Sequence, residues 1–128
     1  MSRLLTLTAI VEAATGLALI AVPSVVVRML LGDEISGASI ALSRVAGLAL
    51  LALGLACWPG RQRADSGSPA FRSMLTYNVL IALYLAYLGT FRHLGGRLLW
   101  PAVALHAVVA LSLVWTWRDE RRTKAIKA

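Results

Sequence analysis

Glu12 is the one ionisable residue in the apolar stretch "LTAIVEAATGLALIAV", which covers residues 7–22. Even on lenient insertion scales, a charge at the centre of a bilayer costs at least about 2.5–3.5 kcal/mol. The carboxyl group must therefore be neutralised, or it must find a partner on a neighbouring segment. A buried acid with such a partner can fix helix register, help to bind a ligand or relay a proton.

Three other polar side chains fall at a similar depth in later apolar blocks, namely Arg44, Tyr84 and His106. At a rise of about 1.5 Å per residue, Glu12 lies about 13 Å from the start of its block, and the other three lie about 9–12 Å from the opposite edge. We predict that these four residues form one polar layer. A structural network is the favoured interpretation, and a cavity that binds a ligand or relays protons is the alternative. In a third interpretation the depth estimate fails and Arg44 snorkels outward.

The third apolar block contains three secondary candidates, Tyr77, Asn78 and Tyr87. Tyr77, Tyr84 and Tyr87 fall close to one helical face. Core packing, with hydroxyls bonded across helices, is favoured for them over a quinone or aromatic ligand site. Asn78 lies nearer the cytoplasmic end of the block and is expected to face in a different direction.

The sequence contains no motif typical of catalysis or of metal binding. Cys57 is the only cysteine, which excludes an internal disulfide and a cysteine-based metal cluster. His106 has no partner at His-x-x-x-His spacing, and His93 lies in a predicted loop, so haem or zinc within one chain is not expected. No serine is flanked by the glycines of a nucleophile elbow. We therefore expect no catalytic residue, no metal and no cofactor.

Composition indicates a membrane protein. Hydrophobic residues make up 59% of the chain and charged residues 15%, against about 45–50% and about 25% in soluble domains. Four apolar blocks each approach the roughly 20 residues that cross a bilayer. They cover residues 4–22, 36–58, 71–90 and 98–117. Together they predict an all-α, integral membrane four-helix bundle that forms a single domain over residues 1–128.

A short segment, "PSVVVRMLLGDE", separates the first two blocks and is too short to span a membrane. It predicts an amphipathic helix at the membrane surface, opened by Pro23 and stopped by Gly32.

Small residues are predicted to let the first two spans approach closely, because membrane helices associate through close packing and interhelical hydrogen bonds. Those on the first two spans are Ala9, Ala13, Gly16, Ser39, Ser43, Gly47 and Gly54.

Basic residues predict the orientation, because cytoplasmic loops carry an excess of Lys and Arg. Nine lie on the side that holds both termini: Arg3, Arg61, Arg63, Arg72, Arg118, Arg121, Arg122, Lys124 and Lys127. Four lie on the other side: Arg28, Arg44, Arg92 and Arg97. Both termini are therefore predicted to be cytoplasmic. The net charge of +7 indicates binding to anionic lipid head groups rather than to nucleic acid. The basic tail, residues 118–128, is expected to extend the fourth helix by a turn or two.

Two stretches, "VEAATGLALIAVPSVVVRMLLG" and "RVAGLALLALGLACW", resemble small bacterial membrane proteins of the DoxX-like group and related four-span families of unknown function. In the first, an acidic residue precedes a glycine, and "PS" begins a short helix that ends in "LLG". The resemblance implies a compact four-helix bundle in the bacterial inner membrane. Some members of the group are associated with redox complexes or with sulfur and quinone chemistry, but this chain has no cysteine pair or other redox motif.

Three functional hypotheses follow. The first is an accessory or scaffolding subunit of an inner-membrane assembly, without catalysis of its own, whose partners are the lipid bilayer and other membrane subunits or further copies of the chain. The second is a binder or transporter of a small apolar or weakly acidic molecule, working through the predicted polar layer. The third is a membrane redox protein related to the DoxX-like group. The absence of catalytic motifs, the short loops and the small size favour the first.

Overall fold

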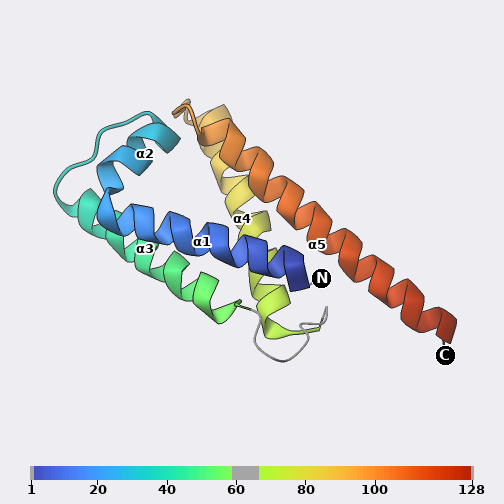
Figure 1. Ribbon diagram of the computed structural model, residues 1–128. Coiled ribbons are helices and arrows are strands. Elements are labelled where there is room, and N and C mark those ends of the chain that lie inside the picture. Colours follow the sequence, from blue (N-terminus) through green and yellow to red (C-terminus); the bar gives the residue numbers. More distant parts are fainter. Residues whose placement is uncertain (1, 59–66, 128) are drawn as a thin grey trace.

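The computed structural model describes residues 2–58 and 67–127. These residues form five helices and no strand (Figure 1): α1 (Ser2–Ala21), α2 (Pro23–Leu31), α3 (Ala38–Ala56), α4 (Pro69–Phe91) and α5 (Leu99–Lys127). All except α2 are long and apolar enough to cross a membrane, with candidate spans of 19 to 25 residues. At about 1.5 Å per residue such spans match a hydrocarbon core of about 30 Å. The predicted all-α membrane bundle is confirmed.

Local sequence signals set the ends of two helices. The helix α2 begins at Pro23, whose missing N–H costs nothing in a first turn. It ends at Gly32, which adopts a left-handed φ of 78° that glycine accepts without strain. The helix α4 begins after Ser68, whose hydroxyl accepts a hydrogen bond from the backbone N–H of Phe71 at 3.3 Å. The predicted bounds of the short helix are confirmed, while its place at a membrane surface stays a prediction.

The helices α1 and α3 run side by side in close contact (Figure 1). A Cβ atom on Gly47 would lie 2.7 Å from the backbone oxygen of Gly16, and one on Gly54 would lie 2.7 Å from the backbone oxygen of Ala9. Any side chain at either glycine would therefore push the helices apart. The predicted close approach of the first two spans is confirmed from Gly47 onward, whereas Ser39 is exposed.

The helices α4 and α5 form a second pair, and the two pairs are joined at opposite ends. At one end, α1, α4, α5 and the end of α3 share a buried core made of Leu5, Ala9, Cys57, Phe71, Met74 and Leu113. At the other end, the N–H groups of Gly96 and Leu98 donate to the backbone oxygens of Leu30 and Met29, at 3.1 and 2.8 Å. These two bonds tie α2 to the segment between α4 and α5. From the buried core the two helix pairs diverge, and α2 bridges the gap between them at the other end (Figure 1).

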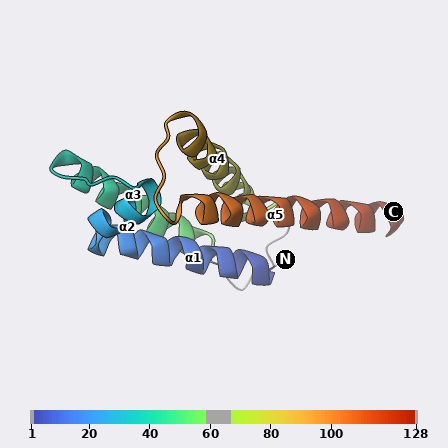
Figure 2. The same ribbon diagram turned by 90° about the horizontal axis from the view of Figure 1, so that it is seen from above.

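The helix α5 continues past Trp117 to Lys127 and projects beyond the other helices (Figure 2). The guanidinium carbon of Arg121 lies 4.4 Å from the centroid of a Trp117 ring, a cation–π contact at the start of the projection. The predicted helical continuation of the tail is confirmed. Arg61 and Arg63, which contribute to the predicted orientation, lie outside the described residues.

Substitution of Gly47 tests the contact between α1 and α3. We expect Gly47→Ala to lower the free energy of unfolding by about 1–3 kcal/mol, because the added methyl group meets backbone that cannot turn aside. Unfolding by dodecyl sulfate in mixed micelles, followed by far-ultraviolet circular dichroism, measures the loss. The control is Ala52→Val at an exposed position of the same helix, which should change stability by less than about 0.5 kcal/mol. Equal losses in both variants would show that the contact is not tight.

Candidate functional site

Glu12 lies buried between α1, α4 and α5. Its side chain is only 2% exposed, and its Oε1 lies 3.9 Å from Nδ1 of His106 on α5. The hydroxyl of Tyr77, on α4, lies beside the carboxyl group. The acid therefore faces the inside of the bundle and lies beside polar groups from two other helices, as expected for an ionisable group within membrane spans.

Asn78 holds the imidazole of His106 in place. Asn78 is fully buried, and its Nδ2 donates to the backbone oxygen of Met74 at 2.9 Å. Its Oδ1 lies 2.9 Å from Nδ1 of His106. The ring of Tyr77 packs edge-on against the imidazole, with centroids 5.8 Å apart. We call Glu12, Tyr77, Asn78 and His106 the polar cluster.

The structure brings together two of the four residues predicted for the polar layer. Glu12 and His106 meet, whereas the side chains of Arg44 and Tyr84 are exposed. Among the described residues Arg44 forms no ion pair with Glu12. The physical reason is that α3 approaches α1 through glycines, so that no room for an arginine remains between the two helices. Arg44 instead extends outward, as in the third interpretation of the sequence.

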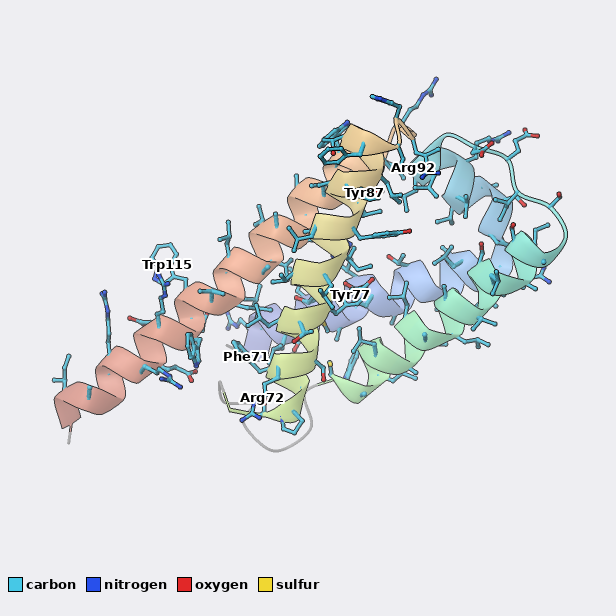
Figure 3. The ribbon with its side chains drawn as sticks, turned by 180° about the vertical axis from the view of Figure 1, so that it is seen from behind. Phe71, Arg72, Tyr77, Tyr87, Arg92 and Trp115 are labelled. Atoms are coloured by element: carbon cyan, nitrogen blue, oxygen red, sulfur yellow. The ribbon has the colours of Figure 1, made fainter. Side chains whose placement is uncertain are left out.

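The tyrosines of α4 do not share one role. Tyr77, midway along the helix, joins the polar cluster (Figure 3). Tyr84 stacks on Tyr87, and Tyr87 stacks on Phe91, with centroids 6.5 and 5.5 Å apart. All three of these rings are exposed on the outer surface of α4.

The expectation that Asn78 faces in a different direction from the site is wrong, because Asn78 is the hydrogen-bond partner of His106. Tyr77 and Asn78 are adjacent on the helix, about 100° apart around its axis. One of them can therefore reach Glu12 while the other reaches His106. The signal that could have identified Asn78 is the one that singled out Glu12, a strongly polar group within an apolar span.

A cleft of about 500 Å³ lies between the two helix pairs, beside the polar cluster. Its polar side chains are Thr15, Tyr77 and His106. The rest of the wall is apolar and comes from all five helices and the residue before α5: Val11, Leu19, Val26, Val27, Leu30, Ala46, Ala49, Leu50, Ile81, Leu85, Leu98, Ala102 and Leu105. Its volume falls within the range of about 300–1,000 Å³ that is typical of small-molecule sites.

A second cavity, of about 50 Å³, also borders the polar cluster. Thr8, Glu12, Asn78 and His106 supply its polar wall. The volume exceeds the roughly 10–15 Å³ that one water molecule requires. The rest of its wall is apolar and comes from Leu4, Leu7, Val11, Leu105 and Val109. His106 lines both this small cavity and the large cleft.

Comparison of the chain with protein-family models, with curated proteins and with solved structures finds no match. The function must therefore be argued from the site itself. Within residues 2–58 and 67–127, no group of three or more His, Cys, Asp and Glu side chains could hold a metal ion.

Replacement of Asn78 tests the polar cluster. We expect Asn78→Leu to lower the free energy of unfolding by about 1–3 kcal/mol, because Nδ1 of His106 loses its hydrogen-bond partner in a buried site. Thermal unfolding in detergent micelles, followed by circular dichroism, provides the measurement. Arg44→Gln is the matched control and should change stability by less than about 0.5 kcal/mol. If Arg44→Gln were as damaging as Asn78→Leu, Arg44 would belong to the buried network after all.

Proposed function

We propose that this protein binds a small, mainly apolar molecule inside the membrane, in the cleft between the α1–α3 and α4–α5 pairs. The cleft itself is the observation that supports this proposal, because it is about 500 Å³ in volume and its wall is apolar except for three side chains. Small-molecule sites in proteins are typically concave and mostly apolar, with a few polar groups that orient the ligand.

The position of the cleft suits a ligand that dissolves in the bilayer. The cleft lies between helices that are long and apolar enough to span a membrane. A strongly polar substrate would lose its hydration in such a place without finding enough partners. An apolar body with one polar group fits the wall better, because Tyr77 and His106 supply polar atoms next to the apolar surface of α2 and α3.

This proposal takes up the second of the three hypotheses from the sequence. An accessory role and DoxX-like redox chemistry stay predictions with their own tests. An accessory subunit should co-purify with a stoichiometric partner in mild detergent. A redox protein should show the visible absorption of a cofactor after gentle purification.

Filling the cleft tests the proposed function. Ala49 lines the cleft, whereas Ala52, three residues later, does not, and both alanines are exposed. With 1-dodecanol as the probe, we expect the wild-type protein to form a saturable one-to-one complex, measured by native mass spectrometry from a mild detergent. Ala49→Phe should weaken this complex at least about tenfold, which corresponds to about 1.4 kcal/mol, because the ring occupies the space of the ligand.

The matched control is Ala52→Phe, which adds the same ring outside the cleft and should bind 1-dodecanol like the wild type. The proposal fails if the wild type forms no saturable complex, or if both variants retain the same affinity.

We further propose that the chain lies in a bacterial inner membrane with its N- and C-terminal ends in the cytoplasm. The nine-to-four distribution of Lys and Arg supports this orientation. Cys57 is the only cysteine in the sequence. The substitution Cys57→Ala therefore gives a cysteine-free background in which single cysteines can be introduced.

Labelling with a membrane-impermeant maleimide tests the orientation. In intact spheroplasts of a bacterial host, Asp33→Cys should be labelled, since it lies between the first two spans. Thr123→Cys, at the far end of α5, should be labelled only after the membrane is permeabilised. The opposite pattern would reverse the proposed topology.

A further inference from the structure

Each of the two hydroxyl groups in the cleft has an acceptor for its hydrogen within the protein. Oγ1 of Thr15 donates to the backbone oxygen of Val11 at 2.9 Å. The hydroxyl of Tyr77 lies beside the Glu12 carboxyl group, whose oxygens can accept its hydrogen. A hydroxyl whose hydrogen is committed can still accept a hydrogen bond through its lone pairs. Thr15 and Tyr77 therefore present acceptors to a molecule in the cleft.

Asn78 determines which nitrogen of His106 carries the proton. Because Nδ2 of Asn78 donates to the backbone oxygen of Met74, its Oδ1 must be the atom that faces His106. The reversed amide would bring two oxygens together. An amide oxygen can only accept, so Nδ1 of His106 is the donor. In the neutral imidazole, Nε2 then carries a lone pair and can only accept.

Nε2 is the atom that His106 presents to the cleft. Nδ1 faces Glu12 and Asn78, which line the small cavity and not the cleft. The opposite edge of the ring therefore borders the cleft. No hydrogen bond joins Nε2 to the described residues, and no buried side-chain nitrogen or oxygen among them lacks a partner. Nε2 is consequently not fully buried.

The helical walls add no donor to this set. Beyond the first turn of a helix, the backbone N–H groups are bonded to carbonyl oxygens of the preceding turn. At the two ends where this rule does not apply, Val26 donates to the backbone oxygen of Val22 and Leu98 donates to that of Met29. The polar atoms available to a ligand are therefore acceptors.

We propose that the cleft selects molecules whose polar group donates a hydrogen bond, such as a hydroxyl, over molecules of the same size whose polar group can only accept. This inference rests on the proposed function and specifies its ligand class. A donor completes the hydrogen bonding of Nε2 of His106, whereas an acceptor-only group would face lone pairs and lose its solvation without compensation. A weak acid would enter in its protonated form, because an anionic group would meet acceptors in the cleft.

Two isomers of formula C12H26O separate donor selection from size and hydrophobicity. The compound 1-dodecanol has a hydroxyl, and methyl undecyl ether has an oxygen that can only accept. Native mass spectrometry titrations of the full chain in a mild detergent give both dissociation constants. We expect the alcohol to bind about five- to tenfold more tightly. In His106→Phe the difference should fall below about twofold, mainly through weaker binding of the alcohol.

Nitrogen-15 spectroscopy of histidine tests the inference without relying on a substitution in the site. In protein labelled with 15N-histidine, His93→Gln leaves only the signals of His106. We expect a protonated Nδ1 and an unprotonated Nε2, and a shift of the Nε2 signal with 1-dodecanol but not with the ether. Asn78→Leu, at a position that does not line the cleft, should allow Nε2 to carry the proton and should reduce the preference for the alcohol.

The outcomes distinguish this inference from the proposed function on which it rests. If neither isomer forms a saturable complex, the proposed function fails and the inference fails with it. If both isomers bind equally well and Ala49→Phe weakens both, the cleft binds ligands without selecting donors, and only the inference is overturned. A proton on Nε2 in the wild-type protein would also overturn the inference alone.

Discussion

A carboxyl group in the middle of an apolar membrane helix cannot face lipid without a cost of several kcal/mol. Glu12 avoids this cost because its side chain is 2% exposed and is met by Tyr77 from α4 and His106 from α5. The imidazole in turn needs a partner of its own, which Asn78 provides. The requirement to satisfy one acid thus accounts for the placement of three polar side chains on two other helices.

The cleft results from the difference between contacts within the helix pairs and contacts between them. Glycines bring α1 and α3 into backbone contact along much of their length. The two pairs, by contrast, are joined by a buried core at one end and by two backbone hydrogen bonds from the Gly96 region to α2 at the other. Helix pairs that diverge from a common core and are bridged at the far end leave a cleft between them. The short helix α2 closes one side of this space with Val26, Val27 and Leu30.

The residue that organises the site does not itself line the cleft. Glu12 borders only the small cavity, and it acts on the cleft through Tyr77 and His106. The acceptors for the hydrogens of these two side chains lie inside the protein, which leaves lone pairs available on the side of the cleft. An intramembrane acid can therefore set the hydrogen-bonding character of a binding surface that it does not touch.

The sequence by itself determined the four spans, the short helix from Pro23 to Gly32, the close approach of the first two spans, and the need of Glu12 for partners. These features follow from hydropathy, from turn residues and from side-chain size, which act over a few residues. Only the tertiary structure decided that Asn78 joins the polar cluster, that Arg44 and Tyr84 lie outside it, and that α2 forms a wall of the cleft. Which face of a helix meets which neighbour depends on the packing of all the helices together. An apolar residue in the sequence does not indicate whether its side chain faces lipid, another helix or a cleft.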